Sequence, residues 1–386
     1  MYNYAYLRLF SYLGRVMRNV FFNIIFLFAL AVQTTAQIND WTVFRGKNSL
    51  SGVSDFEIRA TPSLLWSVAT GLRTKSSPVL SNDILFFGHE NGMLTAVSAN
   101  GTVKWTNNTG SQASAPPLVF AENVIIGSGD GTLRAINKET GRLNWSYKTD
   151  GRIAGSANIW QSGSRTVIVV GSYDYYLHGV NPANGREAWK LETQNYVNGT
   201  PAIFGDRIIF GGCDGFLRQV DPANGRETET VDIGVYIAAS PAISMGKAYL
   251  GDTEGVLYCI DLRSGKIEWK AEASENGGAI NGIPAVGNGY VIIGNDDKQL
   301  YCFDSETGRQ IWKFRTNGAI NGSAVITSTR VLFGSSDGNI FLLNLADGRR
   351  IWSFNAGSPI SSSPIVTRDR FYFLTEDGRL LAFRTN

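Results

Sequence analysis

Seven acidic residues occupy the same position of a repeated turn motif. If they formed a ring, their carboxylates could bind a metal ion. The remaining copy of the motif has Asn91, and the acids are Asp130, Asp174, Asp214, Glu254, Asp297, Asp337 and Asp377. Carboxylate oxygens are preferred Ca²⁺ ligands, so a converging ring would bind a cation. With one acid per repeat, however, the carboxylates would point away from one another rather than toward a common centre. An Asp beside Gly often caps the backbone of its own turn. The pattern favours turn capping over a metal site.

Histidine and cysteine are too sparse to build a nucleophilic or metal centre. His89 and His178 are the two histidines, in different positions of the repeat, where we expect turn or surface roles. A zinc site or catalytic triad needs several such groups at defined spacings. Cys259 and Cys302 share one repeat position, which predicts small buried residues, while Cys213 falls in a turn as a free thiol. No catalytic residue, metal, cofactor or disulfide is predicted.

A unit of about 40 residues, present in eight copies, must position these groups. Each copy has a small residue with Pro, an apolar run, Gly-x-x-Asp-Gly-x-Leu, a second apolar run and a turn ending in Gly. The opening glycines are Gly88, Gly127, Gly171, Gly211, Gly251, Gly294 and Gly334, and the eighth copy has Leu374. The runs have strand length and turn residues at their ends. Four antiparallel strands per copy predict an all-β fold, an eight-bladed β-propeller.

A tryptophan is the second fixed point of the repeat, and copy four has Glu229 in its place. A Trp buries roughly 150–250 Å², which is roughly 4–6 kcal/mol at about 25 cal/mol per Å². We therefore predict a structural role, docking one blade on the next, rather than cofactor stacking. The residues concerned are Trp66, Trp105, Trp145, Trp189, Trp269, Trp312 and Trp352.

The two ends of the repeat region are complementary. The last copy has three apolar runs and no Trp strand, whereas residues 64–68 form a lone Trp strand at the start. One strand from the start and three from the end complete an eighth blade, and this closure removes free sheet edges. We predict one propeller over residues 64–386, with residues 37–63, including Trp41 and Phe44, as an N-terminal arm packed on the ring.

Residues 1–36 have the pattern of a secretory signal peptide, with a basic start, an apolar core over residues 20–32 and a small-residue cleavage site before Gln37. Met17 is an alternative start, which makes residues 1–16 a leader extension, and a membrane anchor is the alternative to cleavage. No cysteine precedes Cys213, so a lipid-attachment site is not expected. The prediction is an exported chain of the periplasm or cell envelope, not a lipoprotein, with no transmembrane segment in its mature part.

Removal of residues 1–36 deletes three arginines and no acid, so the formal net charge changes from +2 to about −1. A near-neutral chain does not favour nucleic acid as a partner.

Residues 135–145 and 302–312 match the pattern Ala-x-Asp-x-x-Thr-Gly-Lys-x-x-Trp closely. In this the chain resembles the quinoprotein-type (PQQ-like) β-propeller repeat family over residues 64–386, and within it the BamB-like outer-membrane assembly propellers. That branch implies a non-catalytic scaffold, expected as a monomer, that binds envelope or outer-membrane proteins. The other branch implies a PQQ-dependent dehydrogenase with Ca²⁺ at the axis and an adjacent cysteine pair. This sequence has no adjacent cysteines and no long insertions, so the enzyme is the alternative.

The segments leading into each first strand are the least repetitive polar stretches and should reach the axial mouth. We predict a ligand or partner site there, formed by Arg73, Lys75, Arg152, Tyr196, Asn198, Tyr236, Asn281 and Asn321. A protein partner, a small ligand or a polysaccharide would fit this position, and channel solvation with turn geometry is the plainer alternative.

Overall fold

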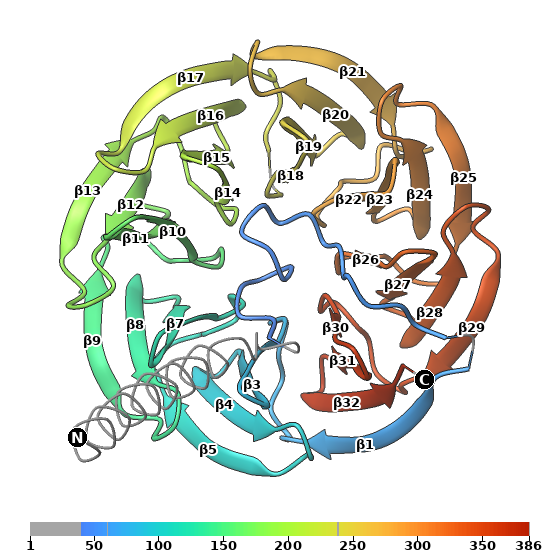
Figure 1. Cartoon of the computed structure of the whole chain (residues 1–386), viewed down its shortest axis with the longest axis horizontal. Helices are drawn as coiled ribbons and strands as arrows, with labels where there is room; N and C mark the ends of the chain where they lie inside the picture. Colours follow the sequence, from blue (N-terminus) through green and yellow to red (C-terminus); the bar gives the residue numbers. More distant parts are fainter. Residues whose placement is uncertain (1–39, 60, 238, 386) are drawn as a thin grey trace, which may run out of the picture. The chain divides into compact units, whose positions relative to one another are not determined.

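The structure is a computed structural model that describes residues 40–59, 61–237 and 239–385, so the predicted signal peptide lies outside the described residues. The described part contains β-strands and no α-helix. The strands form eight four-stranded sheets, and Figure 1 shows these sheets arranged as blades around a central axis. The predicted all-β, eight-bladed β-propeller is therefore confirmed.

Seven blades use consecutive strands, numbered here as blades 1–7. Blades 1 to 3 are β2 (Val79–Ser81), β3 (Ile84–Gly88), β4 (Met93–Ser98), β5 (Val103–Asn108); β6 (Leu118–Phe120), β7 (Asn123–Gly127), β8 (Thr132–Asn137), β9 (Leu143–Lys148); and β10 (Asn158–Ser162), β11 (Arg165–Gly171), β12 (Tyr176–Val180), β13 (Glu187–Glu192). Blades 4 and 5 are β14 (Ala202–Phe204), β15 (Arg207–Gly211), β16 (Phe216–Asp221), β17 (Arg226–Asp232); and β18 (Ala242–Ser244), β19 (Lys247–Gly251), β20 (Val256–Asp261), β21 (Lys266–Glu272). Blades 6 and 7 are β22 (Ala285–Gly287), β23 (Tyr290–Gly294), β24 (Gln299–Asp304), β25 (Gln310–Arg315); and β26 (Val325–Ile326), β27 (Arg330–Gly334), β28 (Asn339–Asn344), β29 (Arg350–Asn355).

Blade 8 joins the two ends of the described chain. Its strand order is β1-β32-β31-β30, with β30 (Ile365–Val366), β31 (Arg370–Leu374), β32 (Arg379–Arg384) and β1 (Ser63–Ala69). Trp66 of β1 pairs with Ala382 of β32 in an antiparallel register. The predicted closure by the N-terminal strand is confirmed.

Burial falls from the axis outward within each blade. In blade 6, β23 and β24 are almost wholly buried because both of their faces pack against neighbouring blades. The outer strand β25 alternates exposed and partly buried residues, as expected of a strand with one solvated face. The core is thus distributed between blades rather than gathered in one place.

The tryptophans on the outer strands contact the next blade in one repeated way. In Trp66, Trp105, Trp145, Trp189, Trp269 and Trp312 the indole Nε1 donates to a backbone carbonyl in the last turn of the following blade, at 2.8–3.2 Å. A glycine of the same turn packs on the ring, where a Cβ would clash. Trp352 faces blade 8, whose third and fourth strands come from opposite ends of the chain without that turn, and it packs on Phe371 and Phe383 instead.

Blade 4 replaces this wedge with polar groups. Glu229 pairs with Gln219 at the Trp position and its carboxylate contacts Gly265. The carbonyl of Leu262, which corresponds to the usual indole acceptor, receives hydrogen bonds from Arg207 (2.9 Å) and Gln219 (2.8 Å). An open cavity of about 410 Å³ lies against Arg207 and Glu229.

The N-terminal arm, residues 40–59, runs along the innermost strands of the blades, and Figure 1 shows it crossing the centre of the ring. On six blades an equivalent backbone N–H donates to a carbonyl of the arm. The pairs, blade residue first, are Leu80 and Trp41, Val119 and Thr42, Ile203 and Asn48, Ile243 and Ser49, Val286 and Ser51, and Ile326 and Gly52. Blade 3 bonds Asn48 through Asn158 and Ile159, and blade 8 accepts from Ser54 at Val366. The arm therefore occupies the axis at the level of the innermost strands.

Arg45 of the arm is almost wholly buried at the axis. Its guanidinium donates to the carbonyls of Ala324 (2.5 Å), Pro284 (3.0 Å) and Leu50 (3.4 Å), and no carboxylate pairs with it in the described chain. Burial lowers the pKa of Arg45 to about 9, so the group still carries its charge at neutral pH. The axis thus contains a buried cation held by backbone oxygens alone.

Candidate functional site

One face of the ring carries both the turns between second and third strands and the connections from one blade to the next. We call it the connection face. In seven blades a turn residue donates its N–H to a carbonyl of the preceding connection, as Tyr173 does to Arg152 and Cys213 does to Tyr196. The connections are extended, so alternate residues point to opposite sides.

This alternation separates the predicted site residues into two groups. Arg73, Arg152, Tyr196 and Tyr236 occupy one repeat position on the outside of the connections. Lys75, Asn198, Asn281 and Asn321 occupy the position two residues later and line a cavity at the axis. The residue between them is buried in every blade: Thr74, Ala113, Ile153, Val197, Ile237, Ile280, Ile320 and Ile360. The structure therefore places the eight residues in two neighbouring but distinct surroundings.

The buried middle residue explains the opening glycine of the repeat. A Cβ on Gly127, Gly211 or Gly334 would clash with Ile153, Ile237 or Ile360 of the following connection. The glycine is needed for close approach rather than for a positive φ.

The axial cavity has a volume of about 220 Å³, and hydroxyl and amide side chains make up about half of its lining residues, beside glycine backbone and the apolar residues Phe44, Pro116, Ala154, Ala239 and Ile283. Phe44 of the arm is among its lining residues, and none of them is Asp or Glu. Lys75 is the one cationic side chain in that lining. The cavity therefore presents polar donors with a positive rather than a negative charge.

A girdle of hydroxyl groups surrounds this cavity, two residues beyond Lys75 and its equivalents. Its members are Ser77, Ser156, Thr200, Ser240, Ser323 and Ser363, with Pro116 and Ile283 at the two remaining positions. In five places the backbone N–H of one of these residues donates to the hydroxyl of its equivalent in the next blade, at 2.6–3.1 Å. The donor and acceptor pairs are Ser156 and Thr200, Thr200 and Ser240, Ile283 and Ser323, Ser323 and Ser363, and Ser363 and Ser77. This series of hydrogen bonds is interrupted at Pro116 and Ile283, which have no hydroxyl group. Sequence reasoning missed this girdle, although the small residue before Pro was its signal.

The outer position of the connections contributes to an aromatic surface, which we call the tyrosine surface and define as Arg152, Tyr173, Tyr175 and Tyr196. The rings of Tyr173 and Tyr196 stack with centroids 4.4 Å apart, and Tyr175 lies 5.2 Å from Tyr196. The Arg152 guanidinium lies 4.5 Å from the Tyr173 ring centroid. Tyr175 and Tyr196 are 44% and 39% exposed. The surface joins the axial cavity through Asn198, which accepts from the Tyr173 hydroxyl at 2.7 Å.

Tyr175 has a left-handed backbone with φ of 73°. Six other blades place glycine at this turn position, and blade 6 has Lys298 with φ of 67°. A non-glycine residue there costs roughly 1–2 kcal/mol. Tyr175 was not predicted as a site residue, although its place in a Gly-x-x-Asp-Gly slot was a readable signal.

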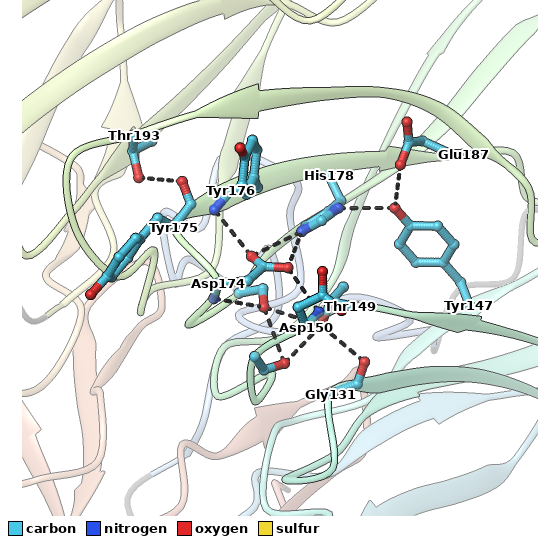
Figure 2. A network of polar contacts seen from close by, with 12 residues as sticks. Gly131, Tyr147, Thr149, Asp150, Asp174, Tyr175, Tyr176, His178, Glu187 and Thr193 are labelled. Carbon is cyan, nitrogen blue, oxygen red and sulfur yellow. Dashed lines mark hydrogen bonds and ion pairs between the residues drawn. The ribbon is translucent and has the colours of Figure 1, made fainter.

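A buried polar network supports the turn that presents Tyr175. Figure 2 shows the Asp174 carboxylate beside His178 Nε2, at 3.1 Å, and accepting from the N–H of Tyr176. The Tyr147 hydroxyl of blade 2 lies 2.9 Å from His178 Nδ1 and 2.9 Å from Glu187. Since that hydroxyl has one proton and donates it to Glu187, it accepts from His178 Nδ1–H.

The groups around Asp174 lower the pKa of its carboxyl. Burial alone would raise that pKa, but the His178 ring and the N–H groups of Tyr176 and Asp150 together outweigh burial. Tyr147, Asp174, His178 and Glu187 are not among the lining residues of the axial cavity. Its role is to hold the turn rather than to meet a substrate.

The histidines were predicted in turn or surface roles. His89 does lie in the turn after β3, where its N–H donates to the Met93 carbonyl, but its ring is fully buried with Nε2 2.9 Å from the Thr95 hydroxyl. His178 lies on β12 and is 3% exposed, so the surface role is wrong for both rings, each of which has a polar partner. In the described residues no group of three or more His, Cys, Asp or Glu side chains could hold a metal ion.

The turn acids of blades 2, 3, 4 and 7 act as predicted: Asp130, Asp174, Asp214 and Asp337 each accept from the N–H two residues later in their own turn. Blades 5, 6 and 8 differ. Asp252 caps the turn in place of Glu254, and Asp297 accepts instead from Ser274 and Glu275 of the preceding connection. In blade 8 the Thr375 hydroxyl accepts the Arg379 N–H, and Asp377 accepts from side chains.

The cysteines lie where the repeat suggested. Cys259 and Cys302 are fully buried and Cys213 is partly buried, all three as free thiols. Burial raises the pKa of Cys213, which disfavours its reactive thiolate.

A quinone with Ca²⁺ does not fit the residues of the axial cavity. Ca²⁺ sites in proteins are built from carboxylate and carbonyl oxygens, with acidic side chains balancing the charge. The lining has no acidic side chain, and its charge is that of Lys75.

Eight four-stranded blades, closed by the first strand of the described chain, define the class of a PQQ-like-repeat β-propeller. The chain belongs to the family described as outer membrane protein assembly factor BamB, whose family model matches residues 51–271 and 253–386.

Curated relatives match shorter stretches. The outer membrane protein assembly factor BamB of Yersinia pestis is 30% identical over 101 residues, which is 24% of this chain and 25% of that protein. The BamB of Francisella tularensis subsp. tularensis is 41% identical over 58 residues, 15% of this chain and 13% of that protein. The chain thus aligns with about a quarter or less of the length of these relatives.

Solved structures share the fold at low identity. BamB from Moraxella catarrhalis superposes with a TM-score of 0.72 at 19% identity, covering 84% of this chain and 100% of that one. A quinohemoprotein alcohol dehydrogenase from Pseudomonas putida HK5 gives a TM-score of 0.79 at 13% identity, covering 90% and 80%. These likenesses establish the propeller fold and do not separate a scaffold from an enzyme.

In the described residues, no helix has the length and apolar character needed to cross a membrane.

Proposed function

We propose that this chain is an exported, non-catalytic propeller scaffold that binds protein partners of the cell envelope, outer-membrane assembly proteins among them. It would act as a monomer in the periplasm or at the envelope, without a lipid anchor. Family membership and the names of the curated relatives support the class of partner. The observation that carries the proposal is the tyrosine surface.

The tyrosine surface has the composition of a protein-binding site. Tyr and Arg are enriched where truncation weakens protein interfaces most, because they combine a large apolar area with a polar end. Here the Tyr196 ring stacks on Tyr173, which also contacts the Arg152 guanidinium, so these side chains already hold one another and little side-chain freedom is lost on binding. Tyr175 is exposed although its backbone conformation is unfavourable for Tyr, which suggests a requirement beyond folding.

Binding through connections is favoured over strand addition. The outer strands present an open sheet edge. Those of blades 1–7 each carry at least one charged residue, as in β17 with Arg226, Glu227 and Glu229, whereas β1 of blade 8 carries none. Charges on an edge strand discourage pairing with another strand.

A pair of glycine substitutions tests this proposal with little effect on the fold. Tyr175→Gly places in blade 3 the residue that most blades have at this position and removes the exposed ring. Lys298→Gly makes the same change at the equivalent position of blade 6 and is the matched control. Immobilised chains of residues 37–386 would be incubated with envelope extract and the captured proteins quantified by mass spectrometry.

We expect the same envelope proteins on wild type and on the Lys298→Gly variant, with at least a tenfold loss on Tyr175→Gly and on Tyr196→Ala. Equal capture by all four proteins would contradict the proposed surface. Titration with pyrroloquinoline quinone and Ca²⁺, followed by a dye-reduction assay with alcohols and sugars, addresses the enzymatic alternative. Cofactor binding with turnover would overturn the scaffold function.

A further inference from the structure

The hydroxyl girdle leaves several protons without an acceptor. Ser77, Thr200, Ser240, Ser323 and Ser363 are 3–6% exposed, and each hydroxyl oxygen accepts a backbone N–H from a neighbouring blade. Among the described residues none of these five hydroxyls has an acceptor for its own proton. Because the accepted N–H fixes one side of each oxygen, the proton is directed elsewhere, and all five residues line the axial cavity.

Ser361 adds an independent observation. It lines the same cavity in the connection of blade 7 to blade 8, and its hydroxyl oxygen is buried with no hydrogen-bond partner in the described chain. An unpaired buried polar group is costly and uncommon, and it often marks the place of a bound molecule.

The charged side chain in the cavity lining is a cation, while the Asp296 carboxylate lies behind the lining and accepts from Asn281 at 3.0 Å. Lys75 lines the cavity and forms no ion pair with a described residue. The buried Arg45 guanidinium bonds to Pro284 and Ala324, which directly follow the girdle residues Ile283 and Ser323. With no acidic side chain in the lining, the surroundings favour a negative group.

We propose that the axial cavity binds one oxyanion group, a carboxylate or a phosphate, between the hydroxyl girdle and Lys75. The donors suit such a group for two reasons. Each oxyanion oxygen accepts several hydrogen bonds, and a hydrogen bond from a hydroxyl to an anion is stronger than one to a neutral acceptor. A volume of about 220 Å³ admits a small anion or the terminal group of a longer molecule. This ligand site is separate from the proposed protein-binding function, which rests on the tyrosine surface.

Isothermal titration calorimetry with residues 37–386 tests the proposal. The probes are sodium phosphate, sodium acetate, and a short glycine peptide with either a free or an amidated C-terminus, all at one ionic strength set with sodium chloride. We expect saturable binding of phosphate or acetate. Binding of the free-acid peptide but not of the amide would identify a chain terminus as the source of the carboxylate, and preference for phosphate would identify a phosphate compound.

Two variants locate the binding. Ser361→Ala removes a hydroxyl without a partner, so the melting temperature should stay the same or rise, while affinity falls about tenfold or more. Lys75→Gln should weaken binding about three- to fivefold, whereas Lys104→Gln on the outer strand β5 should not change it. Absence of saturable binding by every probe would overturn the proposal, as would binding that neither Ser361→Ala nor Lys75→Gln weakens.

Discussion

Replacement of Trp189 by alanine tests whether the outer tryptophans dock one blade on the next. Trp189 is 9% exposed, and its Nε1 donates to the Pro222 carbonyl of blade 4 at 2.9 Å. Gly179 and Gly225 leave room for the ring, since a Cβ at either position would clash with it. Alanine would leave a cavity bordered by two glycines, with no side chain able to fill it.

The expected cost follows from the buried ring and the lost hydrogen bond. Truncation of a buried Trp to Ala costs about 3–5 kcal/mol, and the indole bond contributes about 0.5–1.5 kcal/mol of that. Glu229→Ala changes the equivalent position of the adjacent blade, where the side chain is partly exposed and contacts Gln219 at 3.5 Å. A partly exposed carboxylate of this kind should cost no more than about 1 kcal/mol.

Equilibrium unfolding in urea, followed by circular dichroism, measures both costs in residues 37–386. Trp189→Ala should lower the midpoint with an unchanged slope, because the whole ring still unfolds and exposes the same surface. The difference between the two variants should be at least about 2 kcal/mol. If the two costs agree within about 0.5 kcal/mol, the tryptophan wedge is not what holds neighbouring blades together.

Three further changes test other parts of the ring. Gly52→Ala should cost about 2–4 kcal/mol in urea unfolding, because its φ is +65° and the new Cβ would clash with the Arg45 guanidinium; a cost near zero would contradict the packing of the arm. Ser363→Ala should cost about 1–3 kcal/mol, since the buried Ser323 N–H loses its acceptor, and a thermal melt equal to wild type would refute the girdle bond. The pKa of Asp174 is lowered in the folded state, so its contribution is present above pH 3.8 and lost as pH falls through the folded pKa. The stability gap between wild type and Asp174→Asn should therefore narrow as pH falls from 5 to below about pH 4; a gap that stays constant from pH 5 down to about pH 2 would exclude this linkage.

The sequence was sufficient to predict the ring because each blade has its own copy of the same signals. Short apolar runs, turn residues and a Trp at fixed spacing specify four strands locally, and the lone Trp66 strand specified how the ring closes. Because each blade packs only on its neighbours, the residues of one repeat are enough to specify these contacts.

The axial cavity and the path of the arm could not be predicted in the same way. Arm residues bond to backbone groups of all eight blades, and backbone groups leave no trace in residue type. The burial of His178 depends on Tyr147 of another blade, a contact that no local spacing encodes. Tyr175 was missed for a different reason. In the sequence it is a substitution at the glycine position of the turn, and only the structure shows that its ring packs against Tyr196.

The extended connections explain how one short segment serves three purposes. In the connection to blade 4, Tyr196 faces the outer surface, Val197 is buried under the blade, Asn198 lines the axial cavity and Thr200 belongs to the girdle. Because neighbouring positions point to different sides, substitutions at the outer position need not disturb the girdle residue four positions further along. The girdle in turn requires a hydroxyl from the next blade, which ties its residues together around the axis. Variation should thus be tolerated at the outer positions, and a change such as Thr200→Val should affect the anion site and the Ser156 backbone together while leaving the tyrosine surface intact.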